Sequence, residues 1–136
     1  MRRCFQDRRG SVVVEFAILA PVFLICLFGV IEGARMIWTN QALNEAAYST
    51  ARCRAISATG CTTLDLQVQY AIDRARENGV TIAAANVAIL SGVICRGNAN
   101  SIQVTIQRSF SSPAAQLLPI PGTLAGRACM PVFCAG

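Results

Sequence analysis

A continuous apolar run near the N-terminus is the strongest pattern in the chain. Every residue from 12 to 31 is apolar except Glu15. A helix of about 20 residues is about 30 Å long, which matches the hydrocarbon core of a bilayer. The run therefore predicts a membrane-spanning helix. A buried helix of a soluble protein is the alternative, but such helices seldom run this long without a polar interruption.

The helical pattern continues beyond the apolar run. No glycine or proline interrupts residues 34–59. Apolar residues recur at helical spacings, with polar residues between them, at Ile37, Trp38, Ala42, Leu43, Ala46, Ala47 and Ala51. The sequence thus predicts one helix over about residues 11–55. Trp38, just past the apolar run, suits an anchor at the membrane interface.

A second, amphipathic helix is predicted to begin near Thr62 and Thr63 and to end at Gly79. The threonines and Asp65 are typical of a helix start, and glycine is typical of a helix end. The residues predicted to face inward are Leu64, Val68, Ala71, Ile72 and Ala75. The charged residues fall mostly on other faces, so we expect them to be solvated.

Strands are predicted in the remainder of the chain. Residues 80–90 are rich in valine, isoleucine and alanine, and residues 102–107 alternate strictly between apolar and polar. A turn is expected at residues 96–100, an irregular proline-rich excursion at 111–123, and a last strand at 124–133. The predicted fold class is α+β: a long N-terminal helix, one amphipathic helix and a small antiparallel sheet.

Charge is concentrated at the N-terminal tip. The chain of 136 residues has a net charge of +5, yet Arg2, Arg3, Arg8 and Arg9 all precede residue 10. The folded part therefore has no visible basic stripe, and a nucleic-acid partner is not expected. Arginines before an apolar run favour a cytoplasmic N-terminus, with the rest of the chain outside the inner membrane.

A secretory signal peptide is the next alternative for the N-terminal run. Its apolar core would hold about 7–15 residues and precede a cleavage site of small residues. The run here is longer, and the residues after position 31 match such a site only weakly.

Glu15 is the one ionisable residue within the apolar run. A carboxylate inside a bilayer costs about 2.5 kcal/mol or more, which makes Glu15 a functional candidate. The alternative is that its side chain extends to the headgroups, because it lies only three residues inside the run.

Residues 8–16, RRGSVVVEF, resemble a prepilin cleavage and assembly site. Residues 15–52 extend the likeness, and the chain is similar to the TadE-like family of minor pilins, or pseudopilins, of tight-adherence (Flp) type IV pilus systems. The residues that carry the resemblance are Glu15, Phe16, Ala17, Pro21, Gly29, Glu32, Arg35 and the pairs at 46–47 and 51–52.

The resemblance implies processing and assembly. A prepilin peptidase of the inner membrane would cut after Gly10 and leave Ser11 as the mature N-terminus. Glu15 would then pair with the new α-amino group of a neighbouring subunit. Phe16 and Pro21 belong to the same assembly segment, and the implied partners are other pilins and pseudopilins. The implied role is pilus assembly and surface adhesion.

The expected organisation is a basic cytoplasmic leader at residues 1–10, a helix at 11–55 with its membrane segment at 12–31, and an exported head at 56–136. Gly29 and Gly33 form a small-residue pair that would let another helix approach closely. Chance is the alternative explanation, since glycine is common in membrane helices.

Seven cysteines suggest disulfides in an oxidising compartment. Cys4 falls in the leader and Cys26 in the apolar run. The favoured pairs in the head are Cys53–Cys61, which would tie the two helices together, and Cys95–Cys129. Cys134 is then left over, and a Cys129–Cys134 bridge is the main alternative. A metal site would lack both histidine and a CxxC spacing.

No catalytic pattern is recognisable in the sequence. The chain has no histidine, so neither a cysteine nor a serine could use one as its base. The head acids Asp65, Asp73 and Glu77 have the spacing of a solvent-exposed helix face. We therefore expect neither enzymatic activity nor a cofactor. The alternative function is an uncleaved single-pass membrane protein whose head binds a periplasmic partner or ligand.

Overall fold

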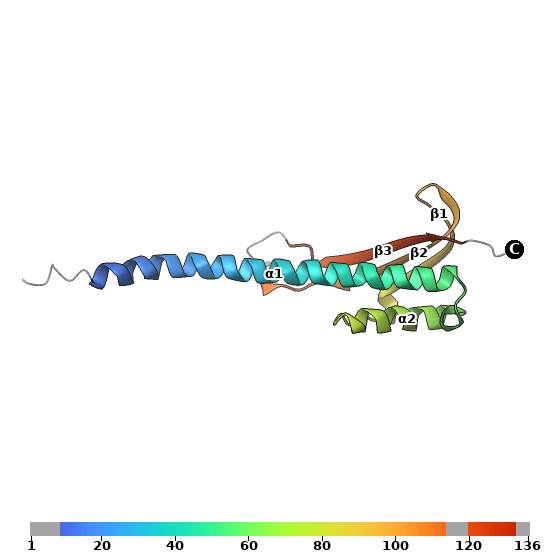
Figure 1. Ribbon diagram of the computed structural model, residues 1–136, viewed down its shortest axis with the longest axis horizontal. Helices are drawn as coiled ribbons and strands as arrows, with labels where there is room; N and C mark the ends of the chain where they lie inside the picture. Colours follow the sequence, from blue (N-terminus) through green and yellow to red (C-terminus); the bar gives the residue numbers. More distant parts are fainter. Residues whose placement is uncertain (1–8, 114–119, 133–136) are drawn as a thin grey trace, which may run out of the picture. The chain divides into compact units, whose positions relative to one another are not determined.

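The computed structural model describes residues 9–113 and 120–132, with only the backbone described for residues 9–11. The elements in chain order are α1 (Arg9–Ala55), the 3₁₀ turn η1 (Thr59–Cys61), α2 (Leu64–Glu77), the 3₁₀ turn η2 (Ala84–Asn86), β1 (Val87–Cys95), β2 (Asn98–Ser109) and β3 (Thr123–Pro131) (Figure 1). The predicted α+β class is confirmed. The single long N-terminal helix and the second helix are both present.

The chain divides into two compact units, Met1–Arg35 and Met36–Gly136. The first unit contains the apolar part of α1. The second contains the remaining part of α1 together with α2 and the sheet. Residues 36–55 of α1 therefore belong to the same compact unit as the residues that the sequence assigned to the head.

Both ends of α2 follow from local sequence. The hydroxyl of Thr63 accepts a hydrogen bond from the backbone N–H of Leu66, which is the N-cap interaction. Gly79 follows the helix with a φ of 75°, and the N–H of Val80 donates to the carbonyl of Ala75 at 2.9 Å. This is a Schellman end, and it needs a left-handed residue that glycine adopts without strain.

The face that α2 buries is narrower than predicted. Gln67, Ala71 and Ala75 are buried, whereas Leu64 is 60% exposed. The inward stripe follows i, i+4 spacing from residue 67, and Leu64 lies one turn before it, in the first turn of the helix. The prediction for Leu64 was wrong. Gln67 is tolerated inside because its side-chain amide donates to the Cys61 carbonyl at 2.9 Å.

The three strands form one antiparallel sheet in the order β1–β2–β3. β1 begins at Val87, so the prediction of a strand over residues 80–90 was wrong for its first part. Residues 83–85 are three alanines, which have low strand propensity, and the chain turns there through η2. β1 then continues to Cys95, beyond the predicted end.

The turn between β1 and β2 is also shorter than predicted. Cys95 pairs with Asn98, so only Arg96 and Gly97 form the turn. Both have positive φ, 49° and 85°, as a type I′ hairpin turn requires. Residues 98–100 therefore belong to β2 rather than to the turn.

The core of the second unit joins α1, α2, β2 and β3. Along β2 the alternation predicted for residues 102–107 is present, with the isoleucines and valine buried. The buried hydrophobic cluster consists of Ala42, Leu43, Ala46, Ala47 and Ala51 from α1, Ala71 and Ala75 from α2, Val80 just after α2, Ile102, Val104 and Ile106 from β2, and Leu124 and Ala128 from β3. Alanine predominates, so the elements pack closely with few large side chains.

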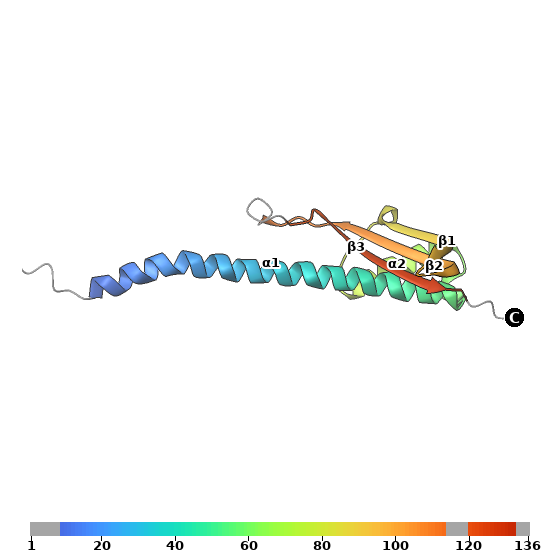
Figure 2. The same cartoon turned by 90° about the horizontal axis from the view of Figure 1, so that it is seen from above.

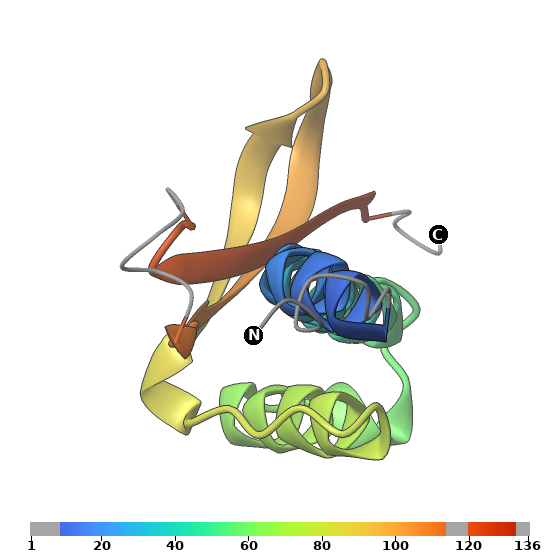
Figure 3. The same cartoon turned by 90° about the vertical axis from the view of Figure 1, so that its left-hand side faces the viewer.

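β3 lies beside α1 (Figure 3), and Gly126 is a point of close contact between them. A Cβ atom at Gly126 would overlap the backbone of Leu43 and Asn44. Next to it, the backbone N–H of Arg127 donates to the side-chain oxygen of Asn44 at 3.1 Å. Glycine at this position therefore permits the contact between helix and strand.

We expect Gly126→Ala to destabilise the second unit. The added methyl group has to push β3 away from α1, and overpacking of this kind costs about 1–3 kcal/mol. Gly122→Ala is the matched control, because a Cβ there meets no atom within 4 Å. Thermal unfolding of the full chain in detergent micelles gives the melting temperatures of both variants. Equal melting temperatures for the two variants would contradict the prediction.

Candidate functional site

The apolar part of α1 presents its side chains outward. All the large hydrophobic residues from Val12 to Ile31 are exposed, from 42% at Leu27 to 71% at Phe16. Among the residues that the structure describes, α1 is the helix long and apolar enough to cross a membrane. An exposed apolar surface of this size is unfavourable in water, and a bilayer or neighbouring helices would cover it.

Glu15 lies on this outward surface. Its side chain is exposed, and its neighbours Val14 and Phe16 are 59% and 71% exposed. No residue in the described parts of the chain pairs with the Glu15 carboxylate. In an apolar environment this carboxylate would need a cation or a hydrogen-bond donor from another molecule.

The remaining residues of the predicted assembly segment lie along the same helix. The backbone of Gly10 and Ser11 is helical, since α1 begins at Arg9. The leader residues 1–8 lie outside the described residues. α1 continues through Pro21 without a break, and Phe16 and Pro21 are both exposed.

Gly29 and Gly33 have open space around them. A Cβ atom built at either position meets nothing within 4 Å. The described residues of the chain therefore do not fill the space beside these glycines. Their role in helix packing stays a prediction.

Glu32 and Arg35 form an ion pair just after the apolar run. The guanidinium Nη1 of Arg35 is 2.9 Å from Oε1 of Glu32, and the second carboxylate oxygen of Glu32 is buried with no hydrogen-bond partner among the described residues. Their i, i+3 spacing was visible in the sequence, but the burial of Glu32 was not. Because Arg35 is well exposed, the pair contributes little to stability.

Trp38 does not pack into the core. It is 65% exposed, and its indole N–H donates to the Asn78 carbonyl at 3.1 Å. The indole therefore joins α1 to the end of α2. Whether the ring also contacts a membrane interface stays a prediction.

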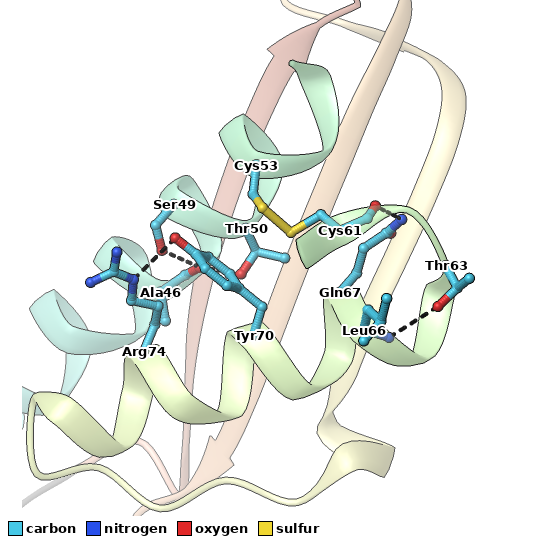
Figure 4. Close-up of a disulfide and its surroundings, with 10 residues drawn as sticks. All are labelled: Ala46, Ser49, Thr50, Cys53, Cys61, Thr63, Leu66, Gln67, Tyr70 and Arg74. Carbon is cyan, nitrogen blue, oxygen red and sulfur yellow. Dashed lines mark hydrogen bonds between the residues drawn. A yellow bond between two sulfur atoms is a disulfide. The ribbon is translucent and has the colours of Figure 1, made fainter. Parts of the chain in front are cut away.

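Two disulfides stabilise the second unit. Cys53 is bonded to Cys61 and Cys95 to Cys129, with Cα–Cα distances of 5.9 and 6.2 Å. These are the pairs favoured from the sequence. The first joins the end of α1 to η1 just before α2 (Figure 4), and the second crosses from β1 to β3 over the central strand.

The other cysteines take no part in these bridges. Cys26 is exposed and free. Cys4 and Cys134 lie outside the described residues. The alternative bridge Cys129–Cys134 was wrong, because Cys129 is bonded to Cys95. Within residues 9–113 and 120–132, no cluster of three or more metal-ligating side chains is found.

A cavity of about 480 Å³ lies between α1 and α2 and was not predicted. Its polar lining includes Tyr48 and Arg52 from α1 and Tyr70 and Arg74 from α2. The Nε of Arg74 donates to the Tyr70 hydroxyl at 3.1 Å (Figure 4). Its Nη1 donates to Glu77 at 2.9 Å. The Tyr70 hydroxyl, and then Glu77, raise the pKa of Arg74 above its ordinary value. Arg74 therefore stays cationic at any physiological pH.

The two units together define a class of protein: a helix suited to cross a membrane once, followed by a small disulfide-bonded α+β unit. Residues 10–52 match the family model of TadE-like protein. The chain therefore contains a TadE-like segment over about a third of its length, and the predicted resemblance is confirmed there. No curated protein and no solved structure matches the chain.

We expect the double change Cys95→Ala and Cys129→Ala to destabilise the second unit strongly. Opening a crosslink between residues 34 apart releases chain entropy worth about 4 kcal/mol at 25 °C. Cys26→Ala is the control, since that cysteine is exposed and free. Urea unfolding of the full chain in micelles, followed by near-ultraviolet circular dichroism, gives the free energy of unfolding of the double variant and of the control. A loss of unfolding free energy no larger than that of the control would show that the Cys95–Cys129 disulfide does not stabilise the unit as expected.

Proposed function

We propose that the chain is a minor pilin, or pseudopilin, of a tight-adherence (Flp) type IV pilus system, and that it acts in pilus assembly and surface adhesion. One observation carries the proposal: the TadE-like match over residues 10–52 coincides with a helix whose apolar side chains are exposed and which contains an unpaired Glu15. Such a surface is suited to packing against membrane or other helices rather than to water.

The proposed location is the inner membrane, with the N-terminus in the cytoplasm and the head in the periplasm. The arginines before residue 10 support this direction, because basic residues remain on the cytoplasmic side. The two disulfides of the second unit support an oxidising environment for the head.

Cleavage after Gly10 would prepare Glu15 for assembly. It would leave an α-amino group on Ser11 with an ordinary pKa near 8, which is mostly cationic at neutral pH. The rise per residue places Glu15 about 6 Å along the helix from Ser11. A neighbouring helix shifted by about that distance would bring its amino group to the carboxylate. Because both charges lose hydration, the pair specifies the register of the helices more than it adds net stability.

The proposed partners are a prepilin peptidase, which would remove the leader, and other pilins and pseudopilins of the same system. Peptidase recognition would depend on the residues next to the cut. The pilins would contact the exposed apolar surface of α1, with Gly29 and Gly33 as candidate points of closest approach.

The second candidate function is an uncleaved single-pass membrane protein whose head binds a periplasmic partner or ligand. The cavity between α1 and α2 favours it, because this cavity presents two tyrosines and two arginines. These residue types are enriched where proteins bind partners.

Cleavage of the leader distinguishes the two candidate functions. We expect co-expression with a prepilin peptidase to yield a chain whose N-terminal sequence begins at Ser11. Gly10→Leu is the control and should block the cut, because a bulky side chain hinders entry of the backbone into a tight active site. N-terminal sequencing or intact mass shows the result. A wild-type chain that still begins at Met1 would favour the uncleaved membrane protein.

We expect Glu15→Ala to leave cleavage near normal and to lower incorporation into the pilus assembly about tenfold, because helices without the pair no longer favour one register over the others; a tenfold preference corresponds to about 1.4 kcal/mol. Glu45→Ala is the matched control, since Glu45 is an exposed glutamate of α1 outside the apolar run. Quantitative immunoblots of membranes and sheared pili measure how much of each variant is incorporated. Equal incorporation of the two variants would rule out the pairing role.

A further inference from the structure

The cavity between α1 and α2 is bordered by a stripe of α1 that does not face the sheet. Residues three and four apart lie on one side of a helix, and the lining residues of α1 follow this spacing: Glu45, Tyr48, Ser49, Arg52, Cys53 and Ile56. The sheet lies beside another side of the same part of α1, with β3 nearest to the helix and β1 farthest from it (Figure 2). The stripe is therefore left for contact with α2 and with a ligand.

The walls of the cavity are held in place by interactions within the second unit. Tyr70 and Arg74 project from α2 toward α1 (Figure 4). The Arg74 guanidinium lies 5.3 Å from the centroid of the Tyr70 ring and donates to both the Tyr70 hydroxyl and Glu77. The disulfide Cys53–Cys61 joins α1 to the turn that precedes α2. A ligand would thus meet walls that need little rearrangement, which lowers the cost of binding.

Arg52 is the arginine of this cavity that these interactions leave available. It is exposed, and no hydrogen bond or ion pair joins it to another residue in the parts of the chain that the structure describes. Its planar fork of N–H donors matches the two oxygens of a carboxylate. The last turn of a helix favours a cation with or without a ligand, so the ligand class has to be inferred from the neighbours of Arg52.

The nearest neighbours of Arg52 along the stripe present apolar surface. Tyr48 lies four residues before it and Ile56 four residues after it, with exposed fractions of 54% and 67%. A bare small anion on Arg52 would leave this apolar surface in water. The cavity of about 480 Å³ also falls in the range of pockets that hold small organic ligands, about 300–1,000 Å³. These surroundings favour an anion that is joined to an aromatic or aliphatic group.

The charges of the lining favour a ligand with a single negative charge. Two arginines, Arg52 and Arg74, and one glutamate, Glu45, line the cavity, which gives a net charge of +1. Glu77 already pairs with Arg74. A phosphate monoester carries between one and two negative charges at neutral pH, and Glu45 would oppose the additional charge. A carboxylate carries one charge and matches the lining better.

We propose that this cavity binds a carboxylate attached to an aromatic or aliphatic group, and that Arg52 holds the carboxylate. Tyr48 and Ile56 of α1, together with the Tyr70 ring of α2, would cover the apolar part of the ligand. A small organic acid and an acidic peptide both present this chemistry. The proposal goes beyond the pilus role and requires neither cleavage nor pilus assembly, so its failure is distinct from failure of the proposed function.

Four small probes test the ligand class on the full chain in non-ionic detergent micelles. N-acetylphenylalanine has both the carboxylate and the ring, its amide lacks the charge, N-acetylglycine lacks the ring, and phenyl phosphate has a more highly charged head. NMR titration follows the Nε–Hε signals of the arginine side chains. We expect N-acetylphenylalanine to bind with a Kd of about 1 mM, as is typical of a ligand of this size. The other three probes should bind about tenfold more weakly or less.

Arg52→Gln should lower the affinity for N-acetylphenylalanine about tenfold, because the charge-assisted contact is lost. Arg76→Gln is the matched control, since Arg76 is an exposed arginine of α2 that pairs with Asp73 and does not line the cavity. Its affinity should equal that of the wild type. Thermal unfolding of both variants checks that the fold is retained, which we expect because Arg52 has no partner among the described residues.

A capped dipeptide, N-acetyl-phenylalanyl-glutamyl amide, distinguishes the two sources of the carboxylate. Binding of this dipeptide in place of N-acetylphenylalanine would support an acidic side chain of a peptide as the ligand, and the reverse would support a small acid or a chain end.

Four results would overturn the proposal. Equal binding of N-acetylphenylalanine and its amide would show that the carboxylate is not recognised. Equal binding of N-acetylglycine would show that the apolar surface takes no part. Tighter binding of phenyl phosphate would identify a different class of anion. An affinity that Arg52→Gln leaves unchanged would show that Arg52 does not hold the ligand.

Discussion

Close contact between α1 and the sheet is the constraint on which the second unit depends. It is made by small residues: alanines 42, 46 and 47 on the helix, and Gly126 on β3. Small side chains let the two backbones approach, and the approach in turn lets Asn44 satisfy the edge of β3. With few large side chains to bury, the unit gains less from the hydrophobic effect than a larger core would. The two disulfides offset part of that deficit by restricting the unfolded chain.

One helix serves two different environments. From residue 12 to 31 its side chains are apolar and exposed, and within residues 42–51 one face is buried against the sheet. The transition is marked by the ion pair between Glu32 and Arg35 and by Trp38. A helix needs no partner for its backbone hydrogen bonds, so it can pass from a membrane or a bundle of helices into a folded head without interruption.

The two edge strands of the sheet, β1 and β3, differ in their surroundings. Asn44 of α1 accepts a hydrogen bond from the backbone of β3, whereas β1 lies at the other edge and its residues 87–90 are apolar and uncharged. The apolar surface of α1 and the open edge of β1 lie in separate compact units. The first unit therefore presents an apolar surface suited to helices or lipid, and the second unit ends its sheet with an uncharged edge strand.

The long helix, the end of α2 at Gly79, the alternation of β2 and the α+β class could be predicted from the amino-acid sequence, because each depends on periodicity or on a local backbone preference. It also singled out Glu15, since a lone carboxylate in an apolar run is visible without coordinates. Which face of α2 is buried, where β1 begins and which strand lies against α1 became visible only in the folded structure. Those features depend on how closely elements distant in sequence can approach. The requirement for glycine at position 126 arises only when β3 meets the backbone of α1.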